Sequence, residues 1–192
     1  MYHIKNDKRA KHSSERIFES LKLCMKEKNF QDITVKEVVE RAEVARATFY
    51  RNFDRLEDVL RYELDTKFSE LYDYLKEYYK SEPDYFKSFF IVPFLKFWYA
   101  DSAIVELLIM ARQRKVLSEA FVSLLERGIS EYYGDGEIEI DHFNYFLAFR
   151  SGIAINVLVE WIRTGKKETP EEVIKILSEQ VSSSMHMGLF SN

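Results

Sequence analysis

The chain has 192 residues, of which 46% are hydrophobic and 31% are charged, so it is long enough to bury a sizeable core and has the composition of a soluble protein. Glycine (6 residues) and proline (3 residues) are scarce, which disfavours a turn-rich sheet protein and predicts an all-α fold. The formal net charge of −4 disfavours a general nucleic-acid-binding protein.

Membrane and secretion signals are not expected in this chain. The longest uninterrupted apolar run, Phe89 to Leu95, is too short to cross a bilayer, and the residues from Met1 to Lys11 are charged with no apolar stretch behind them. The single cysteine, Cys24, cannot form an internal disulfide and belongs to an apolar series, which indicates a buried thiol in a reducing compartment. We therefore expect a cytoplasmic protein that does not bind a membrane.

The charge is divided unevenly along the chain. Residues 1–56 contain 13 Lys and Arg against 9 Asp and Glu, whereas residues 57–192 contain 15 against 23. A basic N-terminal segment suited to phosphate groups is thus joined to an acidic body.

The first predicted helix begins at Ser13 or Ser14, either of which can cap it, and ends near Asn29. Its apolar residues recur at three- and four-residue steps, as on one face of a helix. The basic residues before it are either a disordered arm that contacts DNA or an ordinary frayed terminus. They are Lys5, Lys8, Arg9 and Lys11.

Three more helices follow. Thr34 and Glu37 form a capping box that begins a helix from Val35. The apolar pattern stops at residues 43–45 and resumes in a helix of barely two turns. Asp54 is placed to cap a long fourth helix over residues 55–80, which we expect to connect a basic N-terminal domain (1–55) to a helical body (56–192).

The body is predicted to contain helices over residues 85–100, 102–115, 117–133, 141–164 and 170–187. Pro93 should kink the first of these or mark a boundary inside it. The start of the last helix is strongly marked because Thr169 can cap it, Pro170 takes its first position and Glu172 completes a capping box.

Two short helices joined by a three-residue turn, with another helix in front, have the plan of a helix-turn-helix reader. The major groove of DNA admits one helix, whose exposed polar residues then meet base edges and phosphates. Arg46 can pair with a guanine, Thr48 can contact a thymine methyl or a phosphate, and Tyr50 and Arg51 can contact backbone oxygens. The alternative for Arg46 and Arg51 is that they are ordinary solvated charges of a helix surface, but in this framework DNA contact is favoured.

The segment ITVKEVVERAEVARATFYRNFDRLEDVL, residues 33–60, resembles the DNA-binding domain of the TetR/AcrR family of transcriptional regulators, most specifically over residues 47–53. The resemblance implies that the short third helix enters the major groove and that Tyr50 contacts a phosphate. Residues 149–177 resemble the closing segment of one branch of the family. The DNA-binding candidates are Thr34, Lys36, Arg46, Ala47, Thr48, Tyr50, Arg51, Asn52 and Arg55.

Three positions depart from the family pattern. Glu43 stands where glycine is common, so either the turn avoids positive φ or it accepts strain of about 1 kcal/mol. Ala45 lacks the capping hydroxyl of the usual Ser or Thr. Leu56 replaces a frequent lysine, and Arg55 or Lys36 is then expected to supply the missing phosphate contact.

The resemblance also implies that the body binds an unknown small-molecule inducer and dimerises through its last two long helices. An aromatic cluster is as readily explained by ordinary core packing, and the last two helices can simply complete a monomer core. The ligand-pocket candidates are Phe68, Phe89, Phe94, Trp98, Met110, Gln113, Phe146 and Arg150. The dimer-interface candidates are Ile153, Val157, Trp161, Val173, Leu177 and Val181.

The sequence favours a regulator over an enzyme. The four histidines and Cys24 do not have metal-ligand spacing, and there is no nucleophile elbow or Gly-rich phosphate loop, so we expect no catalytic residue, metal or cofactor. The predicted function is a ligand-responsive repressor that binds a palindromic DNA operator as a homodimer. The alternative is a helical coactivator or protein-interaction module that keeps the same scaffold without binding DNA.

Overall fold

The structure is a computed structural model that describes residues 1–4, 7–80, 91–133 and 141–186, and the all-α prediction is confirmed. These residues form nine α-helices and a short 3-10 turn (Phe30–Asp32). The helices are α1 (Lys8–Glu27), α2 (Val35–Arg41), α3 (Arg46–Asn52), α4 (Leu56–Tyr78), α5 (Ile91–Ala100), α6 (Ala103–Met110), α7 (Arg114–Tyr133), α8 (Phe143–Arg163) and α9 (Pro170–His186).

The chain forms two compact units. The first unit contains residues 1–70 and 103–125, and the second contains residues 71–102 and 126–192. Helices α4 and α7 each contribute to both units, because the division falls within them. The predicted domains, residues 1–55 and 56–192, have other bounds than these compact units and stay a prediction.

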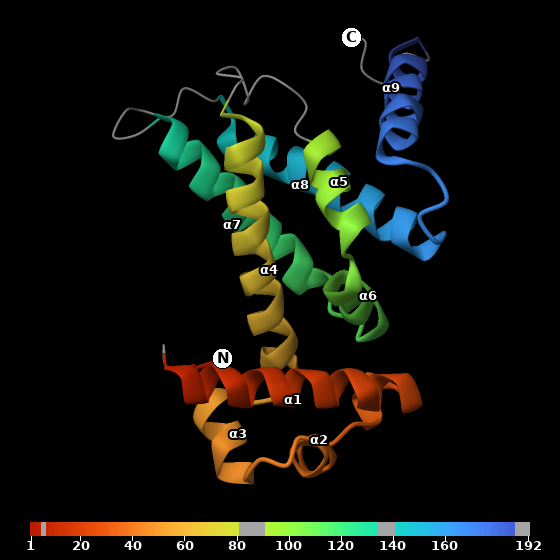
Figure 1. The fold of residues 1–192 in the computed structure, drawn as a ribbon. Coiled ribbons are helices and arrows are strands. Elements are labelled where there is room, and N and C mark those ends of the chain that lie inside the picture. The colour runs from red at the N-terminus through yellow and green to blue at the C-terminus, as the bar shows by residue number, and fades with distance from the viewer. Residues whose placement is uncertain (5–6, 81–90, 134–140, 187–192) are drawn as a thin grey trace. The chain divides into compact units, whose positions relative to one another are not determined.

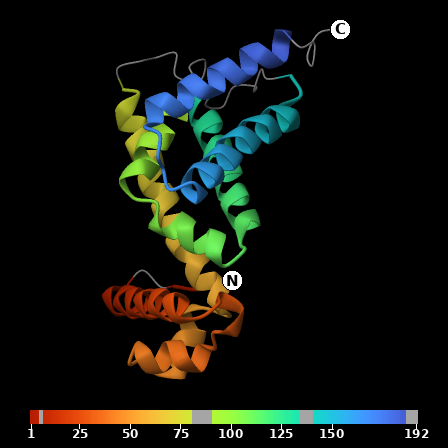
Figure 2. The same ribbon diagram turned by 90° about the vertical axis from the view of Figure 1, so that its right-hand side faces the viewer.

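The head, defined here as residues 1–55, is built around a shared apolar core. Helix α1 lies across α2 and α3 and packs against both (Figures 1 and 2). Ile17, Leu21, Val38, Phe49 and Phe53 are fully buried there. Burying such side chains contributes roughly 1.5–3 kcal/mol each, so the short helices α2 and α3 are held by packing and not by helix propensity.

The predicted capping box at the start of α2 is confirmed. The Thr34 hydroxyl accepts a hydrogen bond from the Glu37 amide at 3.3 Å, and the Glu37 carboxylate accepts one from the Thr34 amide at 2.8 Å. Lys28 also donates to Glu37. Together Lys28 and Thr34 lower the pKa of the Glu37 carboxyl to about 2. The start of α2 is therefore fixed by short-range contacts that the sequence already contains.

The predicted start of α1 was wrong. The helix begins at Lys8, and Asp7 caps it by accepting a hydrogen bond from the Ala10 amide at 2.7 Å. Ser13 and Ser14 lie inside the helix, where their hydroxyls donate to carbonyl groups one turn earlier. The basic residues 8, 9 and 11 are consequently held on a helix instead of a disordered arm, whereas residue 5 lies outside the described residues.

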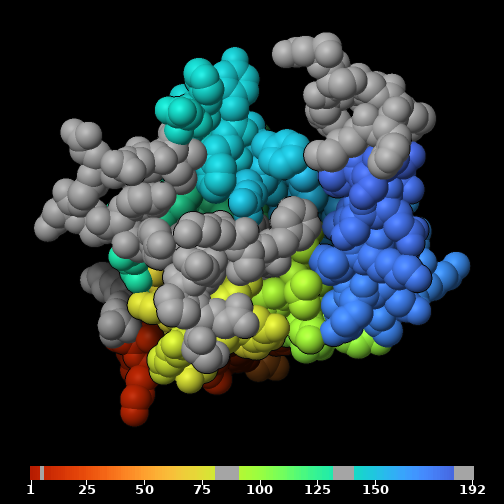
Figure 3. Space-filling view, turned by 90° about the horizontal axis from the view of Figure 1, so that it is seen from above, coloured from red at the N-terminus to blue at the C-terminus, as the bar shows by residue number. Residues whose placement is uncertain are grey.

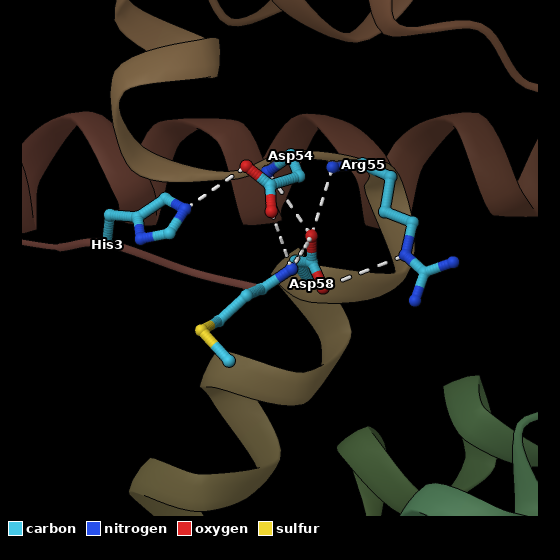
Figure 4. A network of polar contacts seen from close by, with 5 residues as sticks. His3, Asp54, Arg55 and Asp58 are labelled. Carbon is cyan, nitrogen blue, oxygen red and sulfur yellow. Dashed lines mark hydrogen bonds and ion pairs between the residues drawn. The ribbon is translucent and has the colours of Figure 1, made fainter.

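The cap of α4 also differs from the prediction. Asp58, in the first turn, accepts hydrogen bonds from the amides of Asp54 (3.2 Å) and Arg55 (3.1 Å) (Figure 4). The Asp54 carboxylate instead binds the amino group of Met1 at 2.9 Å and the His3 ring at 3.1 Å. The start of α4 is thus stabilised by a carboxylate inside the helix and by the N-terminal segment.

Residues 1–3 extend along the connection between α3 and α4. Tyr2 and Phe53 form an antiparallel β-bridge, and the Tyr2 hydroxyl donates to Asp65 on α4 at 3.0 Å. Asp65 also binds Arg61, which reaches Glu119 on α7 at 3.1 Å. Within the first unit, these contacts connect the N-terminal segment, α4 and α7 in one polar network.

In the second unit, α5 packs against α9, and the predicted capping box of α9 is confirmed. The Trp161 indole donates to the Glu168 carbonyl at 3.0 Å and stacks on Tyr99 with ring centroids 5.7 Å apart. Lys96 on α5 binds Glu171 on α9 at 2.8 Å. These contacts stabilise the turn between α8 and α9. Both helices form part of the surface seen in Figure 3.

Among the described residues, α8 is the one helix that is long and apolar enough to span a membrane by those two criteria. An 18-residue stretch of this helix has a mean hydropathy of 1.3, and 39% of that stretch is buried inside the protein. The core helix of a soluble helical protein meets the same criteria. Length and composition therefore do not identify α8 as a membrane span.

Candidate DNA-binding surface

The turn between α2 and α3 adopts a conformation that usually requires glycine. Glu43 has φ of 50°, in the left-handed region, and its carboxylate accepts a hydrogen bond from Arg16 at 2.8 Å. The Val44 amide bonds to the Val39 carbonyl at 3.1 Å, which closes the turn. The chain accepts strain of about 1 kcal/mol here to set the angle between the two helices.

Helix α3 begins at Arg46 without a side-chain cap. Ala45 is extended and its carbonyl accepts hydrogen bonds from the amides of Thr48 (2.8 Å) and Phe49 (3.3 Å). A Ser or Thr in place of Ala45 would add a hydroxyl acceptor worth about 1 kcal/mol. The position of α3 therefore depends on Phe49 and on the strained turn before it.

One face of α3 presents the predicted contact residues to solvent. Arg46, Ala47, Tyr50 and Arg51 are exposed, and Thr48 is half-buried. Arg46 donates to the Tyr50 hydroxyl at 3.2 Å and lies over its ring, 5.4 Å from the centroid. Arg51 contacts the Thr48 hydroxyl at 3.4 Å. The polar side chains are thus paired along the helix, which restricts their rotamers without burying them.

The cations on α3 differ from other cations of the head in their partners. Arg16, Lys28 and Arg41 each bind a carboxylate of the head. Within the part of the chain that the structure describes, Arg46 and Arg51 have no carboxylate oxygen within 4.0 Å. The positive charge of α3 is therefore not neutralised internally and can attract the phosphates of a nucleic acid.

The remaining DNA-binding candidates lie in different environments. Lys36 is exposed with Glu40 at 3.9 Å, and Arg55 is exposed with Asp58 at 3.9 Å. The Thr34 side chain is exposed, although its hydroxyl serves the capping box. Asn52 is only 2% exposed, because it shares the inner face of α3 with the buried aromatic residues. The buried Asn52 cannot join the exposed α3 residues in a contact with an open groove.

A cavity of about 200 Å³ lies beside Asn52 and is lined by residues that the sequence analysis did not group together. Its lining comes from the start of α1 and the end of α3. The residues are Asp7, Arg9, Ala10, Arg51 and Asn52. The basic character of residues 1–56 was the available signal, and it placed Arg9 in a possible arm before the first helix instead of beside α3, because the start of α1 was misplaced.

The ligand-pocket candidates are distributed over both units. Phe68 is buried in the first unit, where Met110 is exposed and Gln113 is half-buried. Phe94 and Trp98 are fully buried in the second unit, where the Arg150 guanidinium lies over the half-buried Phe146 ring at 5.0 Å. Burial lowers the pKa of Arg150. Phe89 lies outside the described residues.

A larger cavity of about 440 Å³ occurs in the first unit. Of the ligand-pocket candidates, Gln113 is among its lining residues. The lining is Phe30, Gln31, Ile33, Val35, Arg55, Leu56, Glu57, Ala111 and Gln113. Most of these residues come from the head and the start of α4, so this is a different place from the aromatic cluster predicted in the body.

The dimer-interface candidates fall into two groups. Trp161 and Val173 are buried inside the second unit, whereas Ile153, Val157 and Leu177 are half-buried and Val181 is exposed. The sequence analysis missed further exposed apolar residues on these helices. They are Tyr145 (79%), Phe149 (61%) and Ile176 (45%).

Comparisons with known proteins assign the family. Residues 19–62 match the family of bacterial regulatory proteins, tetR family, and residues 88–183 match a transcriptional regulator C-terminal region. No curated protein matches the chain.

Solved structures share the fold. Lin0861 from Listeria innocua has a TM-score of 0.69 at 14% identity over 94% of both chains. A TetR-family transcriptional regulator from Syntrophomonas wolfei str. Goettingen has 0.60 at 20% identity, covering 94% of this chain and 98% of its own. The fatty acid degradation regulator FadR from Bacillus halodurans has 0.53 at 20% identity, covering 87% and 93%. The exposed basic α3, the all-helical body and the two family matches together show that the chain belongs to the TetR family of transcriptional regulators.

Proposed function

We propose that this TetR-family protein is a cytoplasmic repressor that binds a near-palindromic DNA operator as a homodimer and releases it when a small molecule binds the body. The observation that carries the DNA-binding part is α3, whose exposed cations have no carboxylate partner among the described residues while its apolar side is fully buried. Such a helix is rigidly held and positively charged, as a groove-reading element requires.

The roles of the α3 residues follow from their positions. Arg46, in the first turn, is placed to donate two hydrogen bonds to the O6 and N7 atoms of a guanine. Tyr50 and Arg51 are one turn later and are assigned to phosphate oxygens. Thr48 lies between Arg46 and Tyr50 along the helix. Lys36 and Arg55 add exposed charge from α2 and the start of α4. Leu56, which stands where the family often has lysine, is buried and therefore packs in the core instead of contacting DNA.

A homodimer is proposed because one short recognition helix reads only a half-site. The exposed apolar residues Tyr145 and Phe149 on α8, with Ile176 and Val181 on α9, support an interface on these helices. Trp161 and Val173 are omitted from the proposed contact surface because they are buried within the protomer.

The ligand response is proposed to act through α4. This helix contributes to both compact units, so a ligand that displaces its second half also acts on the head. A change in the separation of the two heads in a dimer would prevent both α3 helices from reaching their grooves. The apolar inducer pocket is assigned to the body, where Phe94, Trp98, Phe146 and Arg150 are located.

The second candidate function is a protein-interaction module that does not bind DNA. The strained Glu43, the uncapped Ala45 and the buried Leu56 favour it, because each departs from the family pattern at the DNA-binding head. A selection of random duplexes with the purified protein discriminates the two functions. Recovery of a two-fold symmetric site supports the repressor, whereas retention of a protein partner and no duplex supports the interaction module.

A further inference from the structure

The larger cavity of the first unit is a candidate binding site that differs from the inducer pocket assigned to the body. It measures about 440 Å³, and small-molecule sites in proteins typically measure roughly 300–1,000 Å³. Its lining comes from the segment that leads into α2, from the start of α4, and from the turn between α6 and α7. A compact organic molecule is therefore of the right size for it.

The buried part of the lining is apolar. Phe30, Ile33, Leu56 and Ala111 line the cavity, and each is between 4% and 8% exposed. An apolar group that leaves water to lie on these side chains gains free energy in proportion to the apolar area that it buries. The chemistry of this floor thus favours a ligand with an apolar part.

Three polar side chains of the lining have unused hydrogen-bonding capacity. Gln31 is exposed, whereas Glu57 and Gln113 are half-buried. In the part of the chain that the structure describes, none of these three side chains has a hydrogen bond or an ion pair. Two carboxamides and a carboxylate beside an apolar floor can both donate to and accept from the polar groups of a ligand.

The lining carries one cation and one anion, both at the start of α4. Arg55 is exposed, with its Nε atom 3.9 Å from an Asp58 oxygen. Asp58 already accepts hydrogen bonds from the amides of Asp54 and Arg55, so most donors of the guanidinium stay available. Glu57 lies two residues after Arg55. A ligand with one charge is attracted by one of these side chains and repelled by the other, whereas a zwitterion satisfies both.

The turn between α6 and α7 is strained where it borders the cavity. Arg112 has φ of 58°, in the left-handed region that disfavours a residue with a Cβ atom. The Gln113 amide donates to the Leu108 carbonyl at 2.8 Å, which closes the end of α6. Ala111 and Gln113, on either side of the strained residue, both line the cavity. Strained residues of this kind cluster at ligand sites.

We propose that this cavity binds an apolar α-amino acid as a zwitterion. The carboxylate of the ligand pairs with Arg55, its ammonium group pairs with Glu57, and its side chain lies on the apolar floor. The carboxamides of Gln31 and Gln113 supply the remaining polar contacts. Because the ligand contacts three separate segments of the first unit, it stabilises that unit. The inference goes beyond the proposed function and does not depend on DNA binding.

The test uses the full chain with L-phenylalanine and L-leucine as probes, and affinity is measured by isothermal titration calorimetry. Phenylpropanoate lacks the ammonium group and phenethylamine lacks the carboxylate, although both keep the apolar ring. Glu57→Gln removes the proposed acceptor of the ammonium group, and Ala111→Leu fills part of the floor. Glu70→Gln is the matched control, because it removes the same charge from α4 outside the cavity lining, where Glu70 binds Lys67.

We expect both amino acids to bind, and phenylpropanoate and phenethylamine to bind at least about tenfold more weakly than L-phenylalanine. Glu57→Gln should weaken the binding of L-phenylalanine by about tenfold. Ala111→Leu should abolish it, and Glu70→Gln should leave it unchanged. In a second arm, NMR should show that the probe shifts the side-chain amide resonances of Gln31 and Gln113, which locates the binding site.

Three results would overturn the proposal. Equal affinity for L-phenylalanine and for either singly charged analogue excludes a zwitterion site. No binding of either amino acid excludes the site, as does binding that leaves the two glutamine resonances and the affinity of Glu57→Gln unchanged. If Ala111→Leu does not fold, Glu57→Gln still decides, because the Glu57 side chain has no contact among the described residues whose loss would disturb the fold. Failure to select a duplex would refute the proposed function and leave this result unaffected.

Discussion

Replacing Glu43 by glycine should stabilise the protein, although it removes an ion pair. The left-handed conformation costs a residue with a Cβ atom about 1–2 kcal/mol, and glycine avoids this cost. Glycine loses more backbone entropy on folding, about 0.5–1 kcal/mol. The pair with Arg16 is largely exposed and contributes about 0.2–0.5 kcal/mol. At the middle of these ranges the net gain is a few tenths of a kcal/mol, so a second variant is needed to measure the strain by itself.

Glu43→Ala is that variant, because alanine keeps the Cβ atom and its strain but loses the same ion pair. We expect the E43A protein to be less stable than the wild type by about 0.2–0.5 kcal/mol. We expect the E43G protein to be more stable than the E43A protein by about 1 kcal/mol, or roughly 2–4 °C in melting temperature for a chain of this size. Urea unfolding of the three proteins, with equal m-values, measures both differences. An E43G protein no more stable than E43A would refute the argument that the turn is strained.

Three further predictions concern binding, pH and assembly. Arg46→Ala and Tyr50→Ala should each abolish a salt-sensitive shift of the selected duplex without lowering the melting temperature; an unchanged shift would remove these residues from the contact set. Because Lys28 helps to lower the pKa of Glu37 to about 2, below its unfolded value, the stability that this pair contributes is complete above about pH 4.5 and is lost as the pH falls toward 2. Unfolding curves between those pH values should show a smaller acid loss for Glu37→Gln. Phe149→Glu should convert a dimer to a monomer in sedimentation experiments with the helical content unchanged, and an intact dimer would exclude this face of α8.

Local patterns accounted for most of the helices. The capping boxes at Thr34 and Thr169 were predictable because all their contacts lie within three residues along the chain. The start of α1 was not, since Asp7 and Ser13 are both good caps and the sequence does not indicate which one is used. Among competing local signals, contacts with the rest of the chain decide.

The candidate site was predictable in part, for a related reason. The exposed face of α3 follows from helical periodicity once Phe49 is placed in the core. The same periodicity puts Asn52 three residues after Phe49 on the inner face, but its polar side chain suggested exposure. Arg9 and Arg51 are far apart in the sequence, so only the packing of α1 on α3 shows that they line one cavity.

The stacking of Arg46 on Tyr50 has an evolutionary consequence for this branch of regulators. A guanidinium held by its neighbour loses less conformational entropy in the base contact proposed for Arg46, so the two side chains would act as one module. A related protein in which Arg46 is replaced would also lose the contact that positions the Tyr50 side chain. Paired replacement at these two sites, four positions apart, is the expected signature when such proteins diverge in the promoters they control.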